Sequence, residues 1–186
     1  MAAVKARLAS GNPHKLEELR AALPGWELEL LDTDREYPPE DGATYYENAC
    51  AKAAFGRESA TADEWVLGED SGIEVAALDG RPGIASARWA ADGVAQLLVE
   101  LDGIEDRRAR YVCELVALSP DGEERRGTGI LEGAIATERR GDEGFGYDPI
   151  FVPAGEDRTV AELGGSWKRT NSHRARAAAT LATTVS

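Results

Sequence analysis

The chain has 186 residues, of which 42% are hydrophobic, and it carries a formal net charge of −13 at pH 7. This length and apolar content suit one folded domain over residues 1–186 and exclude an intrinsically disordered chain. The acidic balance argues against duplex nucleic acid as a partner, because basic faces bind phosphate backbones, but it allows a small anionic ligand in a local basic pocket.

Strands and helices alternate in the first half of the chain. The apolar spacing predicts strands and helices in turn, with strands at 4–10, 26–32 and 65–70 and helices at 16–24 and 45–60. Thr44 is the expected N-cap of the second helix, and Glu47 follows three residues on, as in a capping box. The third strand runs into LGEDSG, where Asp, Ser and Gly favour a turn. IEVAALDG at 73–80 is then a fourth strand or the continuation of the third.

The second half predicts an antiparallel hairpin and a closing helix. A Gly- and Pro-containing loop at 81–89 precedes a helix at 93–104, and long strands within 107–136 flank the turn residues Pro120, Asp121 and Gly122. The helix that begins in SHRARA has its N-cap at Asn171 or Ser172. Alternating elements followed by a hairpin favour an α/β fold with a mixed sheet.

The N-terminus and the cysteines predict a cytoplasmic protein with no membrane partner. MAAVKARLASGN lacks the apolar core of a signal peptide, and no apolar run approaches the roughly 20 residues that a bilayer requires. Cys50 and Cys113 have no CxxC spacing and resemble small buried hydrophobes of a reducing compartment.

Two segments place polar groups where an anion would bind. ASGNPHK at 9–15 puts a short turn between a strand and a helix, so that backbone N–H groups and Lys15 point at a potential anion. The alternative is an ordinary turn in which Asn12 or Pro13 starts the helix. Asn48 and Lys52 are four residues apart on a helix and can reach one site, although a solvated polar face is the alternative.

Acidic and aromatic residues mark further candidates. Glu69 and Asp70 follow an apolar strand, where adjacent carboxylates suit a metal or general-base site if they are not simply a turn. His173 and Arg174 begin a helix, although cations favour helix C-termini, and this placement suggests an anionic partner. GFGYDP at 144–149 offers aromatic faces and a carboxylate that suit a purine, or a packed hairpin end.

Taken in order, ASGNPHK, ENACAKA, GEDSGIEVAALDGRPGIASARW, GFGYDPIFVP and SHRARA resemble the inosine triphosphate pyrophosphatase (Ham1-like) family from Ser10 to Arg176. The resemblance implies an elongated, twisted mixed sheet flanked by helices, with two lobes and an intervening cleft. It also implies Mg²⁺-dependent hydrolysis of ITP, dITP and XTP to the monophosphate and pyrophosphate by a homodimer. The segment after Trp89 is shorter than in many relatives, which leaves local surface and dimer detail open.

The same resemblance assigns residues to roles. Asp70 is implied as metal ligand and base for the attacking water, with Glu69 and Glu40 as further metal ligands and Glu36 as the alternative to Glu40. The implied substrate-binding residues are Ser10, Gly11, Asn12, Pro13, His14, Lys15, Lys52, Ser71, Phe145, Gly146, Tyr147, Asp148, Lys168, His173 and Arg174. Two rival functions remain: a Maf-type pyrophosphatase of other base preference, and a nucleotide-binding protein without catalysis.

Overall fold

The computed structural model describes residues 3–184. In chain order its elements are β1 (Val4–Leu8), α1 (Pro13–Ala22), β2 (Trp26–Leu30), α2 (Tyr45–Arg57), β3 (Trp65–Val75), the 3₁₀ helix η1 (Ala76–Leu78), β4 (Pro82–Gly83), α3 (Gly93–Glu100), β5 (Arg108–Leu118), β6 (Glu124–Ile135), β7 (Phe151–Pro153), α4 (Val160–Asn171) and α5 (His173–Thr184). Within these residues, no helix is long and apolar enough to cross a membrane.

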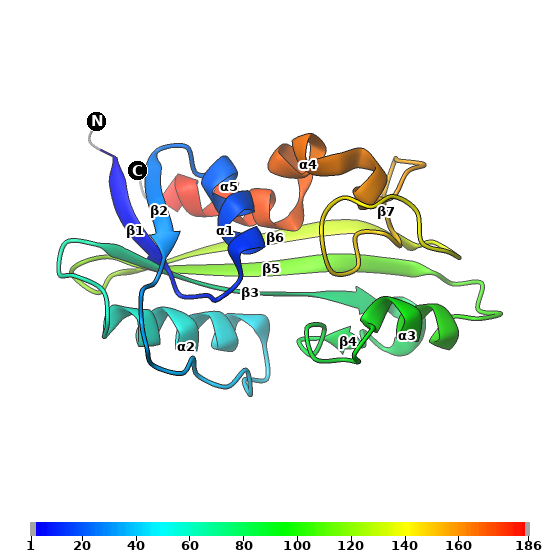
Figure 1. Cartoon of the computed structure of the whole chain (residues 1–186), viewed down its shortest axis with the longest axis horizontal. Helices are drawn as coiled ribbons and strands as arrows, with labels where there is room; N and C mark the ends of the chain where they lie inside the picture. The colour runs from blue at the N-terminus through cyan, green and yellow to red at the C-terminus, as the bar shows by residue number, and fades with distance from the viewer. Residues whose placement is uncertain (1–2, 185–186) are drawn as a thin grey trace. The chain divides into compact units, whose positions relative to one another are not determined.

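The strands form a mixed sheet with the order β2-β1-β3-β5-β6-β7, and β4 pairs with β3 beside this path (Figure 1). β1 pairs in parallel with both β2 and β3, whereas β4 is antiparallel to β3 and β7 is antiparallel to β6. The predicted α/β fold with a helix-flanked mixed sheet is therefore confirmed.

The chain divides into two compact units that are not sequential domains. Unit 1 contains residues 3–70, 113–129 and 174–184, and unit 2 contains residues 71–112 and 130–173. β3, β5 and β6 each contribute residues to both units.

In unit 1, α1 and α5 cover one face of the strands and α2 covers the other (Figure 1). Successive side chains of β5 point to opposite faces of the sheet, so this strand contributes to the core on each side. Leu115 packs with Leu19 of α1 and Leu181 of α5, whereas Val116 packs with Ala49 and its neighbours in α2. Unit 1 thus has a core on each side of the sheet.

In unit 2, one core joins α3, α4 and the adjoining parts of the strands. Leu97 of α3 and Val160 of α4 pack with Ile73, Tyr111 and Phe151. The N-terminus of α4 is closed by a capping box between Thr159 and Glu162.

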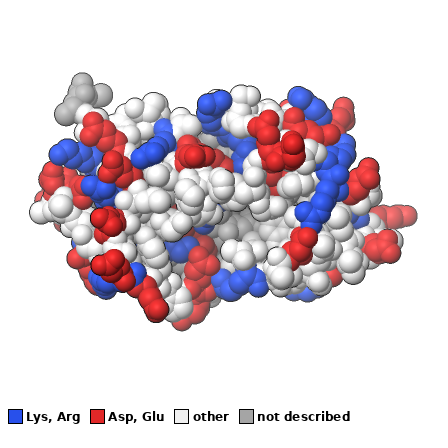
Figure 2. Space-filling model, in the orientation of Figure 1, with Lys and Arg blue, Asp and Glu red and all other residues white. Residues whose placement is uncertain are grey.

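On the face shown in Figure 2, acidic and basic side chains are interspersed.

Local sequence signals located most element boundaries correctly. Asn12 caps α1, with Pro13 as its first residue, and Thr44 caps α2 by accepting the N–H of Glu47. The predicted hairpin is also present, with a turn in which Ser119 N–H bonds to the carbonyl of Glu123. α5 begins at His173, directly after Ser172.

One predicted turn is absent from the structure, and one helix was not predicted. The turn expected at Asp70, Ser71 and Gly72 is wrong, because β3 continues without interruption to Val75. α4 was not anticipated over its full length, since its sequence contains two consecutive glycines and Gly164 adopts a φ of 79°. Such a backbone conformation interrupts helical periodicity but suits glycine, which has no Cβ.

Candidate functional site

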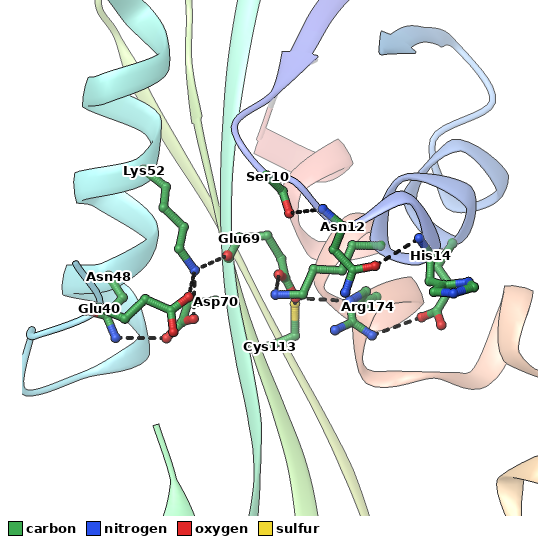
Figure 3. Close-up of polar contacts among 12 residues, drawn as sticks. Ser10, Asn12, His14, Glu40, Asn48, Lys52, Glu69, Asp70, Cys113 and Arg174 are labelled. Atoms are coloured by element: carbon green, nitrogen blue, oxygen red, sulfur yellow. Dashed lines mark hydrogen bonds and ion pairs between the residues drawn. The ribbon is translucent and has the colours of Figure 1, made fainter. Parts of the chain in front are cut away.

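Close packing of α2 on β3 brings two helical side chains to Asp70. A Cβ at Gly68 would lie 2.0 Å from the carbonyl oxygen of Ala49, so the helix backbone rests directly on the strand. Gly68 and Asp70 are two residues apart and face the same side of the sheet. Asn48 and Lys52, which lie within one helical turn of Ala49, consequently reach the Asp70 carboxylate (Figure 3).

The Asp70 carboxylate is buried and each of its oxygens has a donor. Lys52 Nζ lies 2.9 Å from Oδ1, and Asn48 Nδ2 donates to Oδ2 at 3.0 Å. Lys52 Nζ also bonds to the Glu40 carboxylate and to the carbonyl oxygen of Glu69. Burial raises the pKa of Asp70 above its ordinary value, and the opposing effects of Lys52 and Asn48 do not fully cancel that increase.

Glu69 points to the opposite side of β3, because consecutive strand residues alternate between faces. Its carboxylate is completely buried and lies 2.6 Å from Lys15 Nζ and 3.0 Å from Arg174 Nε. Cys113 Sγ contacts the same carboxylate at 3.5 Å, and burial raises the pKa of this thiol. Burial alone would raise the pKa of Glu69, but the two cations outweigh it and hold that pKa well below its usual range.

Arg174 is placed by a second close helix-to-strand contact. A Cβ at Gly127 of β6 would lie 2.1 Å from the carbonyl oxygen of Ala177, so α5 rests on the strand. One turn earlier, Arg174 pairs with Glu69 and, at 3.2 Å, with Glu18 of α1. This buried charge cluster joins α1, β3 and α5 (Figure 3).

The loop before α1 has the geometry predicted for a strand-to-helix turn. Asn12 N–H donates to Ser10 Oγ at 3.1 Å, and Asn12 Oδ1 accepts the N–H of His14 at 3.0 Å. Gly11, Pro13 and His14 are exposed. The helix N-terminus is therefore accessible to an anion, although one of the first N–H groups already has an acceptor in Asn12.

The carboxylate oxygens of Glu40 and Asp70, which surround Lys52 Nζ, are ligands that fit a magnesium ion. Mg²⁺ is usually bound by one or two carboxylates, with waters and substrate phosphates completing the octahedron. Glu40 and Asp70 already converge on one cation, the Lys52 ammonium group. Residues 3–184 contain no group of three or more His, Cys, Asp or Glu side chains that could hold a metal ion.

Glu69 does not fit the same ion, because its carboxylate lies across the strand and is paired with Lys15 and Arg174. The predicted acid pair therefore separates into two sites on opposite faces of β3. Glu36 is exposed, and the contact to Lys52 favours Glu40 as the acidic residue of that loop.

A second group of predicted residues lies in unit 2. The buried Asp148 carboxylate accepts from Lys168 Nζ at 2.7 Å, from the N–H of Phe145 at 2.9 Å and from the Tyr111 hydroxyl at 3.3 Å. Lys168 Nζ also lies 4.6 Å from the centre of the Phe145 ring. The ring of His173 stacks on Tyr111, with centroids 4.5 Å apart.

Tyr147 packs inward in the same unit. It is 7% exposed, and its hydroxyl donates to the Ser86 carbonyl oxygen at 2.8 Å. Gly146, with a φ of 61°, is exposed, and Ser71 is half-buried. Of the two aromatic residues in this loop, Phe145 is half-buried and Tyr147 is buried.

The predicted site residues fall into two groups, one in each unit. Unit 1 contains Ser10 to Lys15, Glu40, Lys52, Glu69, Asp70 and Arg174, and unit 2 contains Ser71, Phe145 to Asp148, Lys168 and His173. Sequence reasoning missed Glu18, Cys113 and Tyr111. No local pattern marks these three residues, because each occupies an ordinary position in a helix or strand. The residue that each one contacts lies far away in the chain.

Comparison with known proteins identifies close relatives. A family model described as the Ham1 family matches residues 6–184. A dITP/XTP pyrophosphatase of Synechocystis sp. is 41% identical over 176 residues, covering 91% of this chain and 89% of that protein. One from Deinococcus deserti is 41% identical over 181 residues, covering 94% and 86%.

The comparison with solved structures finds proteins of the same kind. The Ham1 protein of Staphylococcus aureus has a TM-score of 0.82 at 35% identity, with 97% of each chain covered. The nucleoside-triphosphatase / dITP/XTP pyrophosphatase of Mycobacterium abscessus has a TM-score of 0.75 at 40% identity, covering 98% of this chain and 100% of that one. The predicted resemblance is confirmed, and this chain belongs to the Ham1 family.

Proposed function

We propose that the chain is a nucleoside triphosphate pyrophosphatase that hydrolyses dITP, XTP and ITP to the monophosphate and pyrophosphate. The observation that carries the proposal is the buried Asp70 carboxylate, which is held by Lys52 and Asn48 beside Glu40. It occurs in a chain 41% identical to dITP/XTP pyrophosphatases over nearly its whole length. A buried carboxylate that is held in place by hydrogen bonds is a suitable general base for water.

Glu40 and Asp70 would hold Mg²⁺, which supplies positive charge to the triphosphate oxygens when bound. Asp70 accepts the proton of the attacking water at a carboxylate oxygen. Lys52 favours the ionised form of Asp70 through its contact with Oδ1. Ser10 to Lys15 bind phosphates at the N-terminus of α1, where backbone N–H groups and the Lys15 ammonium favour anions; Ser71 is a further phosphate contact.

The unit 2 group would bind the purine. The half-buried Phe145 ring offers a stacking face. Asp148 already accepts from Phe145 N–H, Lys168 and Tyr111 and therefore holds the loop in shape. Gly146, Tyr147 and His173 complete the predicted set. Arg174 was also assigned to the base, whereas the structure pairs its guanidinium with Glu69 and Glu18. A cytoplasmic location and a homodimer complete the proposal and rest on sequence and family resemblance.

The test is pyrophosphate release from a panel of nucleotides with and without Mg²⁺. dITP, XTP and ITP are expected to be hydrolysed far faster than ATP and clearly faster than GTP. ATP carries an amino group at position 6 where they carry an oxygen, and GTP shares that oxygen but adds an amino group at position 2. Mispairing of a buried polar group costs about 1–3 kcal/mol, and several mismatches give large selectivity. A preference for pyrimidine or modified nucleotides would favour the Maf-type alternative. Binding without pyrophosphate release would favour the non-catalytic one.

A further inference from the structure

The first turn of α2 contacts both the loop that carries Glu40 and the strand that carries Asp70. Asn48 is 2% exposed; its Oδ1 accepts the N–H of Gly42 at 2.9 Å, and its Nδ2 donates to Asp70 Oδ2 at 3.0 Å. Glu40 precedes Gly42 by two residues. One buried amide therefore connects the loop of one carboxylate to the other carboxylate.

The chemistry of the partners fixes the orientation of the Asn48 amide. The Gly42 N–H can only donate and therefore requires the amide oxygen, whereas an ionised Asp70 can only accept and requires the amide nitrogen. Alanine would satisfy neither partner. Since Lys52 binds the other Asp70 oxygen, the carboxylate is held at both ends.

The loop backbone also lies directly against this helix turn. A Cβ at Gly42 would lie 2.7 Å from Asn48 Oδ1 and 2.9 Å from Glu47 Cβ. Both distances are shorter than normal contacts between such atoms. The loop can therefore approach Asn48 closely because residue 42 has no side chain.

We propose that Asn48 is a positioning residue for a divalent cation held by Glu40 and Asp70. It sets the separation and orientation of the two carboxylates before the cation binds, so less conformational freedom is lost on binding. This inference rests on the proposed function, in which the same carboxylates hold Mg²⁺. Residues that orient metal ligands typically change metal affinity by about 10–100-fold when they are replaced.

The test is Mn²⁺ binding to the full chain without nucleotide, measured from the electron paramagnetic resonance signal of free Mn²⁺. Asp70→Asn identifies which binding belongs to this site. Asn48→Ala is expected to weaken that binding by about 10-fold or more. Glu47→Ala is the matched control, because the exposed Glu47 carboxylate accepts the N–H of Ala43 in the same loop. It is expected to change the Kd by no more than about 2-fold, as exposed substitutions usually do.

Gly42→Ala tests the same connection from the loop side. Its Cβ displaces the loop from Asn48 without replacing a residue that contacts Asp70, so it should also weaken Mn²⁺ binding. Circular dichroism and thermal unfolding establish whether each variant is folded. If Asn48→Ala does not fold, Gly42→Ala provides the test. Combined with Asn48→Ala, Gly42→Ala should add little, because both act through one contact.

The outcomes separate the inference from the proposed function. Unchanged Mn²⁺ affinity in a folded Asn48→Ala or Gly42→Ala variant, with wild-type binding that depends on Asp70, would overturn the positioning role and leave the proposed function intact. A wild-type chain that releases pyrophosphate but has no Asp70-dependent Mn²⁺ binding would overturn the inference alone. A chain that shows neither would overturn both.

Discussion

Replacing Glu69 by glutamine tests whether this residue is an internal counter-ion rather than a metal ligand. The substitution keeps the shape of the side chain but removes the charge between Lys15 and Arg174. Loss of one partner from a buried ion pair costs about 3–5 kcal/mol, because the remaining charge is left uncompensated. Arg174 retains Glu18 at 3.2 Å, so the lower end of the range, about 3 kcal/mol, is expected.

Denaturant and thermal unfolding at pH 7 measure this loss. For a chain of this size, each kcal/mol shifts the Tm by about 2–4 °C, so Glu69→Gln should unfold about 6–12 °C below the wild type. Glu58→Gln is the control, since Glu58 forms an exposed pair with Arg35 that is worth about 1 kcal/mol or less. Glu69→Asp keeps the charge and should lose less stability than Glu69→Gln.

The same comparison has a defined pH dependence. The pKa of Glu69 is lower in the folded chain than in the unfolded chain, so its ionised form favours folding. The advantage of the wild type over Glu69→Gln is complete above the unfolded pKa of about 4.3. It declines as the pH falls from there toward the folded pKa. Equal stability of the two proteins at pH 7, or a difference that grows on acidification, would refute the counter-ion role.

Three further predictions concern the site and its supports. Asp70→Asn is expected to lower turnover by about 10²-fold or more because it removes the base. The variant should lose some stability but still fold, because Lys52 keeps its contact with Glu40, and near-normal turnover of the folded variant would contradict the assignment. Lys168→Ala leaves Asp148 without its cation at 2.7 Å and should cost about 3–5 kcal/mol in denaturant unfolding, whereas an unchanged midpoint would show the pair to be dispensable. Gly68→Ala drives a methyl group against α2 and should cost about 1–3 kcal/mol or more, measured by thermal unfolding, and full stability would contradict the close packing.

Local signals in the sequence were sufficient for the elements that depend on neighbouring residues. The caps at Asn12 and Thr44, the hairpin turn after Ser119 and the shared helix face of Asn48 and Lys52 all involve partners within a few positions of one another. Such contacts form by the same geometry wherever the pattern occurs. The family resemblance then implied that Asp70 is a metal ligand and base.

The tertiary structure decided which groups surround the two adjacent acids. The sequence shows Glu69 and Asp70 side by side, but the continuous strand β3 directs them to opposite faces. One expected site therefore separates into two ion-pair clusters, one around each carboxylate. The partner of Glu69 in α5, Arg174, lies 105 positions away. A contact over that separation leaves no periodic or local signal in the chain. It depends instead on how closely a helix approaches a strand, which glycines such as Gly68 and Gly127 permit because they place no Cβ between the two backbones.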